Sequence, residues 1–243
     1  MERLDKLVSS VFGLSRREAQ AAVRQGRVEV SGAPIRLPET KVDPAAPIAL
    51  DGEEGAYARY VYIMLDKPAG YVSATEDSRD PTVLELLPEL YLKRKLGVAG
   101  RLDKDATGLL LLTDDGTLNH RLTSPRYHLD KRYDVRLDYP AREKDVRVFA
   151  EGMDLGDFTA MPGLLEIDPL DPTHCFVTIR EGKFHQVKRM FEKCGRRVLA
   201  LRRVAMGGLL LDEALGEGGF RLLTAQEIQY LTEKCAIKQE SQK

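Results

Sequence analysis

The sequence has few cysteines and histidines, no long apolar run and almost no net charge. Its three cysteines, Cys175, Cys194 and Cys235, form no Cys-x-x-Cys pair, and the four histidines lack the spacing of a zinc site. Free thiols are typical of a reducing compartment, so we expect a cytoplasmic protein without a structural metal. No apolar run approaches the roughly 18 residues of a membrane span, and the charged N-terminus lacks the apolar stretch of a signal peptide.

The net charge of −1 hides two clusters of basic residues. Residues 1–41 contain eight Lys and Arg against five Asp and Glu, and residues 180–203 contain nine against two. Clustered basic charge is typical of a surface that binds the phosphates of a nucleic acid. The alternative is an ordinary solvated helix face, which fits the first cluster better than the second.

Residues 1–48 predict a small module of two helices followed by a strand. Apolar residues recur at helical spacing over residues 3–12, and Ser15 with Glu18 predicts a capping box that opens the second helix. A strand is expected at residues 27–30, after a glycine that ends this helix.

The rest of the chain predicts a linker, a larger domain and a tail. Residues 49–59 are polar and acidic and indicate a linker, residues 60–233 a second domain, and residues 234–243 a polar tail. Strands and helices mix without regular alternation, which favours an α+β domain on a mixed sheet. In it we expect strands at 60–66, 109–112, 131–138 and 175–180, and helices at 82–87, near 118, at 142–151, at 185–194 and from 224.

The most informative segment is residues 100–116, GRLDKDATGLLLLTDDG. The apolar run at 109–112 predicts a strand buried on both faces, so Asp103 would lie at its mouth, where a rigid element can hold a reacting carboxylate. Two other interpretations stay open. An aspartate in a turn commonly bonds its own backbone. The carboxylates also loosely match a calcium loop, although the glycines before them make a poor incoming helix.

This segment resembles the catalytic motif of the pseudouridine synthases, which is G-R-L-D followed by a T-G pair and a leucine run ending in T-x-D-G. The match runs from Gly100 to Gly116, with Ala106 as a minor departure. The resemblance implies a mixed, mainly antiparallel sheet and an isomerisation that requires no cofactor and no metal. It also implies that Asp103 is the essential carboxylate and that Arg101 lies close to the bound nucleotide.

Two further motifs resemble the same family. Lys131 and Tyr133 match its K-x-Y motif, which implies that Tyr133 stacks on the target uracil; on pattern alone a strand tyrosine is a packing residue. The segment EGKFHQVKRM at 181–190 matches the third motif, which implies that Lys188 pairs with Asp103; on pattern alone it is a solvent-facing lysine. The expected catalytic residues are Asp103, Tyr133 and Lys188, and the expected RNA-binding or substrate-binding residues are Arg101, Arg16, Arg17, Arg24, Lys131, His185, Gln186 and Arg189.

Residues 1–48 resemble the S4-like RNA-binding domain, which implies that their outward arginines contact RNA phosphates. The RsuA-type subgroup of synthases carries this domain, and KPAGYVSA at 67–74 and TSPRYH at 123–128 resemble that subgroup. The resemblance implies conversion of uridine 516 of 16S ribosomal RNA to pseudouridine by a monomer whose partner is ribosomal RNA. A sister synthase acting on 23S ribosomal RNA and a non-catalytic RNA-binding protein remain alternatives.

Overall fold

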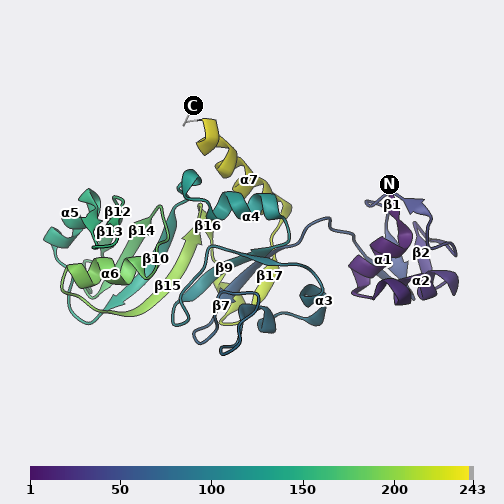
Figure 1. The fold of residues 1–243 in the computed structure, drawn as a ribbon, viewed down its shortest axis with the longest axis horizontal. Helices are drawn as coiled ribbons and strands as arrows, with labels where there is room; N and C mark the ends of the chain where they lie inside the picture. Colours follow the sequence, from purple (N-terminus) through teal and green to yellow (C-terminus); the bar gives the residue numbers. More distant parts are fainter. Residues whose placement is uncertain (241–243) are drawn as a thin grey trace. The chain divides into compact units, whose positions relative to one another are not determined.

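The computed structural model describes residues 1–240 of the chain. These residues form two compact units, each with its own hydrophobic core (Figure 1). The first unit is Met1–Val61 with Pro88–Lys95, and the second is Tyr62–Leu87 with the residues from Leu96 onward. Within the described range, no helix combines the length and apolar character needed to cross a membrane.

The first unit contains the predicted two helices, α1 (Leu4–Phe12) and α2 (Arg16–Arg24), and a four-stranded sheet in the order β3-β2-β5-β6. The capping box is confirmed, because Ser15 Oγ accepts a bond from the Glu18 N–H and the Glu18 carboxylate accepts one from the Ser15 N–H. The strands are β2 (Val28–Val30), β3 (Ala33–Pro34), β5 (Ile48–Leu50) and β6 (Glu53–Gly55), and a separate pair joins β1 (Glu2–Arg3) to β4 (Lys41–Val42).

The prediction of a linker at 49–59 is wrong, because residues 48–55 form a hairpin in the sheet of the first unit. Strand β5 pairs with β2, and β6 pairs with β5. Asp51 and Gly52 both have positive φ, of 52° and 86°, as a tight hairpin turn requires. An Asp-Gly pair between short strands was therefore the signal for a hairpin, and the acidic composition concealed it.

The segment Pro88–Lys95 also corrects the predicted boundaries, because it lies inside the second domain in sequence but packs in the first unit. It contains helix α3 (Glu89–Leu92). Lys93 Nζ donates to the carbonyl of Gly13 at 2.6 Å, and a Cβ on Gly13 would lie 2.9 Å from Leu90. The chain therefore enters the first unit twice, and residues 60–233 are not one continuous domain.

The second unit is built on a nine-stranded sheet. All of its strand pairs are antiparallel except β9 with β15, which confirms the predicted mixed, mainly antiparallel sheet. In order, the strands are β13 (Leu164–Ile167), β14 (His174–Ile179), β10 (Lys131–Leu137), β15 (Val198–Met206), β9 (Thr107–Thr113), β7 (Tyr62–Lys67) and β17 (Phe220–Leu222), with β8 (Gly97–Ala99) on β9 and β16 (Leu209–Leu210) on β15.

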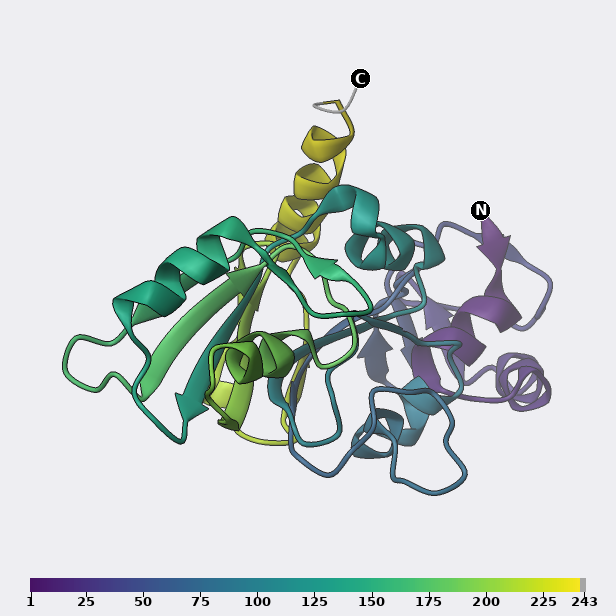
Figure 2. The same cartoon turned by 60° about the vertical axis from the view of Figure 1, so that its left-hand side comes forward.

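Helices cover the sheet at both ends. Phe149 of α5 (Glu143–Glu151) packs on Phe191 of α6 (Gln186–Lys193) with ring centroids 4.9 Å apart, so both helices cover the same face near β13 and β15 (Figure 2). Helix α4 (Gly116–Thr123) lies near β8 and β9, and α7 (Ala225–Glu240) packs against α4. The remaining short elements are 3-10 turns at Val83–Leu86, Pro125–Tyr127 and Glu213–Leu215, and the pair β11 (Met153–Asp154) with β12 (Thr159–Ala160).

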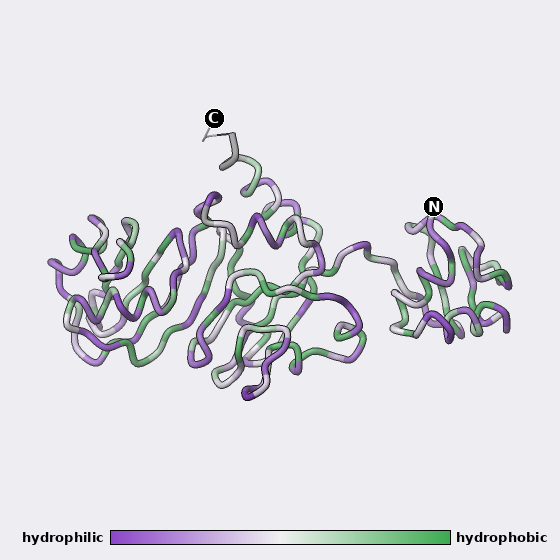
Figure 3. Tube along the Cα trace, viewed as in Figure 1, coloured by the Kyte–Doolittle hydropathy of each residue, from purple (hydrophilic) through white to green (hydrophobic). Residues whose placement is uncertain are grey.

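Strand β15 is the longest strand, and the sequence did not predict it. Two consecutive arginines interrupt its apolar pattern, whereas the leucine run of β9 is uniformly hydrophobic (Figure 3). Arg203 is fully buried and donates to the carbonyls of Leu109 and Gly100, and Arg202 forms a two-bond ion pair with Asp66. The side-chain bonds of both cations go to groups far away in the sequence, so no local pattern could reveal the strand.

The prediction of a polar tail from residue 234 is wrong up to Glu240. Helix α7 continues through these residues, and Cys235 is fully buried in the same core cluster as Leu231. Ile228, Leu231 and Cys235 recur at spacings of three and four, which is the apolar stripe of a packed helix. Residues 241–243 of the predicted tail lie outside the described residues.

Candidate active site

The loop at residues 100–106 leads into β9 and is held by backbone-directed bonds. Ser73 Oγ donates to the carbonyl of Leu102 at 2.8 Å and accepts from its N–H at 3.0 Å. Gly108 has φ of 97°, and a Cβ there would lie 2.3 Å from the carbonyl oxygen of Arg203. Only glycine fits this close approach, so the position of β15 requires a glycine at this place in the motif.

A buried lysine that the sequence analysis did not predict as a site residue also holds this loop, through hydrogen bonds to its carbonyls. Lys67 is fully buried, and its Nζ donates to the carbonyls of Pro68, Lys104 and Ala106 at 3.0, 3.3 and 2.7 Å. Burial lowers the pKa of Lys67 to about 8, although the carboxylates of Asp105 and Asp103 act in the opposite direction. The only sequence signal was a lysine before a proline at the end of a predicted strand.

The structure brings Lys188 of α6 to Asp103, the pairing that the third motif implies. Lys188 Nζ lies 3.0 Å from Asp103 Oδ2 and 2.6 Å from Asp105 Oδ1. Burial acts to lower the pKa of Lys188, but its bonds to Asp105 and Asp103 outweigh this effect and the pKa is raised. Lys188 is therefore a cation shared between two carboxylates. The sequence did not predict the second ion pair, which is with Asp105.

Tyr133 is buried on β10, beside the loop. The pairing of β10 with β15 shifts by one residue between Arg132 and Tyr133, a bulge of the kind that re-aims side chains. Tyr133, Asp103 and Arg101 line a cavity of about 50 Å³. A second cavity of about 850 Å³ shares Arg101 and Asp103 with the first and also contacts Lys188. The predicted catalytic residues thus surround one pair of adjoining cavities.

Two further predicted residues lie at the rim. Arg101 is exposed, lines both cavities, and has no ion pair among the described residues. His185 precedes α6 with φ of 51°, and its Nε2 lies 3.7 Å from Asp103 Oδ1. The preceding residue, Phe184, lines the larger cavity and was not selected from the sequence. The signal available in the sequence was an aromatic residue directly before the histidine of the third motif.

Three predicted RNA-binding residues have structural partners instead. Lys131 is buried and its Nζ donates to the carbonyl of Leu129. Arg189 pairs with Asp157. Gln186 is buried, lines the smaller cavity and donates to the carboxylate of Glu181. Lys131 and Arg189 line neither cavity, so the structure places them outside the group around Asp103.

The basic cluster at 180–203 is not a free phosphate-binding surface. Seven of its nine cations have partners in the second unit, which are carboxylates in six cases and backbone carbonyls for Arg203. Among the described residues only Lys183 and Lys193 have no recorded partner. Most cations of this cluster are therefore paired with carboxylates, chiefly in neighbouring loops. In the first unit, Arg16 pairs with Asp5, whereas Arg17 and Arg24 are exposed without an ion pair there.

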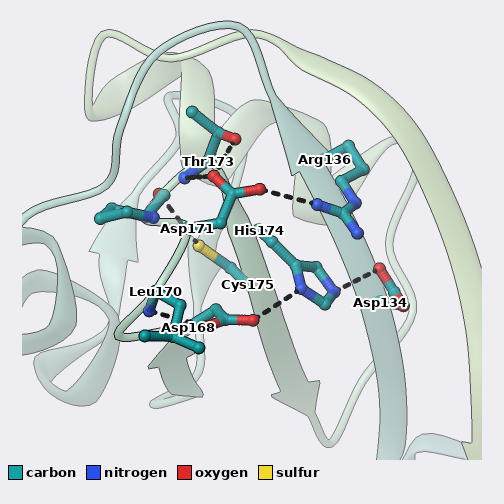
Figure 4. A network of polar contacts seen from close by, with 9 residues as sticks. Asp134, Arg136, Asp168, Leu170, Asp171, Thr173, His174 and Cys175 are labelled. Carbon is teal, nitrogen blue, oxygen red and sulfur yellow. Dashed lines mark hydrogen bonds and ion pairs between the residues drawn. The ribbon is translucent and has the colours of Figure 1, made fainter.

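The acidic cluster at 168–171 belongs to a separate network between β10 and β14 (Figure 4). His174 lies between Asp134, at 3.0 Å from Nε2, and Asp168, at 3.2 Å from Nδ1. Asp171 accepts bonds from Arg136 and Thr173. The network fixes the turn between β13 and β14 and lines neither cavity.

The geometry does not favour the calcium alternative. The first two carboxylates of that loop, Asp103 and Asp105, both face the ammonium of Lys188, which already supplies a positive charge between them. Over residues 1–240, no group of three or more His, Cys, Asp or Glu side chains could hold a metal ion.

Known proteins resemble the chain along nearly its whole length. A family model described as RNA pseudouridylate synthase matches residues 61–193, and an S4 domain model matches residues 2–48. The chain is 44% identical over 230 residues to ribosomal small subunit pseudouridine synthase A of Escherichia coli (strain K12), covering 93% of this chain and 98% of that protein. It is 41% identical over 238 residues to an uncharacterized RNA pseudouridine synthase, YtzG, of Bacillus subtilis (strain 168), covering 96% and 100%. A crystal structure of pseudouridylate synthase superposes with a TM-score of 0.67 at 39% identity, covering 95% of this chain and 100% of that one.

Proposed function

Since this chain belongs to the RNA pseudouridylate synthase family, we propose that it isomerises one uridine of small-subunit ribosomal RNA, the equivalent of uridine 516 of 16S rRNA. The choice of small-subunit RNA rests on relatives of 41–44% identity that bear the name ribosomal small subunit pseudouridine synthase A. The observation that carries the chemistry is the carboxylate of Asp103, held 3.0 Å from Lys188 at the meeting of two cavities.

The reaction breaks the N1–C1′ bond of uridine, turns the uracil, and joins C5 to C1′. The proton on C5 is lost and N1 gains one, so nothing is oxidised or hydrolysed. Asp103 is the reacting carboxylate of this isomerisation, and the ammonium of Lys188 supplies the opposite charge 3.0 Å away in a partly enclosed site. The loop bonds of Ser73 and Lys67 keep that carboxylate in a fixed position, as catalysis requires.

The two cavities suggest successive positions for the nucleotide. The larger cavity of about 850 Å³ can receive an extruded nucleotide, whereas the 50 Å³ beside Tyr133 holds about one or two water molecules. A uracil ring reaches Tyr133 only when the residues between Gly182 and Gln186 move outward. Stacking on Tyr133 then offsets the stacking that the uracil lost in the RNA.

The first unit supplies RNA contacts of a different kind. Arg17 and Arg24 on α2 contact phosphates of the ribosomal RNA without reading its sequence. The protein works as a monomer in the cytoplasm, where ribosomal subunits are assembled from their RNA and proteins.

Chemical mapping of pseudouridine in ribosomal RNA from cells with and without the gene tests this function. We expect one uridine of small-subunit RNA to lose its modification, and wild-type protein but not Asp103→Asn to restore it. Loss at a site in large-subunit RNA would identify the sister activity instead. An unchanged map would indicate an RNA-binding protein without this activity.

A further inference from the structure

An exposed aromatic ring stands at the rim of the larger cavity. Phe184 is 75% exposed, although large apolar side chains are usually withdrawn from water. One face of its ring is stacked on His185, with ring centroids 3.8 Å apart and planes 16° apart. The ring is therefore held in a defined orientation while most of its surface is left to solvent.

The surroundings of Phe184 match the chemistry of a nucleotide. Lys183 and Arg101 line the same cavity, are exposed, and have no ion pair among residues 1–240. A flat apolar ring beside cations free of carboxylates offers stacking to a base and attraction to its phosphate. His185, beneath the ring, lies 3.7 Å from Asp103, so the stacked pair leads directly to the reacting carboxylate.

We propose that Phe184 stacks on an RNA base adjacent to the uridine that is isomerised. The inference rests on the proposed function only in taking RNA as the ligand. When a uridine leaves the base stack, its neighbour loses one stacking surface, and Phe184 replaces it. The stack of base, Phe184 and His185 thereby fixes the RNA strand beside the cavity that contains Asp103. Because every base has an aromatic face, the contact orients the RNA without selecting a sequence.

Substitution of Phe184 tests the contact in the full-length protein. The substrate is a synthetic RNA that contains the uridine identified by mapping, whichever ribosomal RNA that is. We expect Phe184→Ala to lower kcat/KM about five- to 150-fold, the range found for alanine replacement of base-stacking aromatics, and Phe184→Trp to stay within about threefold of wild type. Tyr139→Ala is the matched control, because Tyr139 is 67% exposed and lines neither cavity.

A cycle with abasic RNA separates stacking from a general loss of shape. The nucleotide on the 5′ or the 3′ side of the uridine is made abasic, and kcat/KM is measured with wild type and with Phe184→Ala. We expect that, at one of these two positions, the abasic change costs wild type about as much as Phe184→Ala does and costs Phe184→Ala little more.

Provided that wild type is active, two results would overturn the stacking role. One is that the abasic change and Phe184→Ala act independently at both positions, and the other is that Phe184→Ala is as active as Tyr139→Ala. If wild type itself forms no pseudouridine in any ribosomal RNA, the proposed function fails. The Phe184 contact is then tested separately, by fluorescence of 2-aminopurine in unmodified small-subunit RNA. Quenching that depends on Phe184 supports it, and quenching that does not overturns it.

Discussion

The loop around Asp103 and helix α2 of the first unit place their cations in opposite ways. Around the Asp103 loop, Lys67 and Lys188 are each bonded to two or three oxygens at defined distances. In the first unit, Arg17 and Arg24 are exposed and carry no ion pair among the described residues. A reacting carboxylate must be positioned within about 0.5 Å, which requires cations with fixed partners. Attraction to RNA phosphates is long-ranged and tolerant of position, so free arginines suffice.

Asp103→Asn is expected to have the largest effect, because it removes the charge of the carboxylate that the loop holds in place. The amide keeps the shape of the side chain but removes the charge, so we expect pseudouridine formation to fall at least about 1000-fold, or about 4 kcal/mol of barrier. Tritium release from RNA labelled at uracil C5 measures the rate, and thermal unfolding and RNA affinity should remain near wild type. Residual activity within tenfold of wild type would show that Asp103 is not the reacting group.

Lys188→Met and Lys193→Met ask whether position or mere charge matters on α6. Both remove one cation from one helix, but Lys193 is exposed and has no partner among the described residues. We expect Lys188→Met to lower kcat about 100-fold, or about 3 kcal/mol, and Lys193→Met to change it less than about threefold. Equal small losses in RNA affinity, with kcat preserved in both, would move Lys188 to the phosphate-binding group.

The pH dependence of stability tests how Lys67 is held. Its pKa is about 8 in the native protein and 10.5 when solvated, so between these values the unfolded chain holds the proton that the native protein has released. Raising the pH in this window therefore favours the native state. From pH 7 to pH 9.5 we expect the free energy of unfolding of wild type to gain about 2 kcal/mol relative to Lys67→Met, measured by urea denaturation.

The matched control for that measurement is Lys104→Met, because Lys104 is exposed and pairs with Asp80 at the surface. Its difference from wild type should stay constant across the same pH range. A wild-type curve that runs parallel to that of Lys67→Met would contradict the assignment of Lys67 as a buried, weakened base.

The double substitution Arg17→Ala with Arg24→Ala tests whether the exposed arginines of α2 bind RNA phosphates. We expect RNA affinity to fall about tenfold and the slope of log affinity against log salt to become shallower by about one unit per lost phosphate contact. The kcat value should not change. Arg27→Ala is the control, because Arg27 is exposed on the same unit but already paired with Asp51, and its salt slope should match wild type.

Local signals predicted much of the fold correctly. The capping box at Ser15 and the leucine run of β9 each depend on neighbours within a few residues, and each is found in the structure. The hairpin at residues 48–55 and the end of helix α7 were missed because polar composition concealed local patterns that favour them, whereas strand β15 had no such local pattern. In β15, Arg203 donates hydrogen bonds to carbonyls on and before β9, about a hundred positions earlier in the chain.

For the candidate site, the sequence alone predicted which groups react, because the motif around Asp103, the tyrosine of β10 and the lysine of α6 are recognisable as written, and this assignment stays a prediction. Only the tertiary structure decided which cations lie beside Asp103 and which pair with carboxylates elsewhere. Within the basic cluster at 180–203, Lys188 meets Asp103 whereas Arg189, the next residue, meets Asp157. Adjacent residues on a helix point about 100° apart, so their partners are chosen by the elements packed on each side and not by the sequence around them.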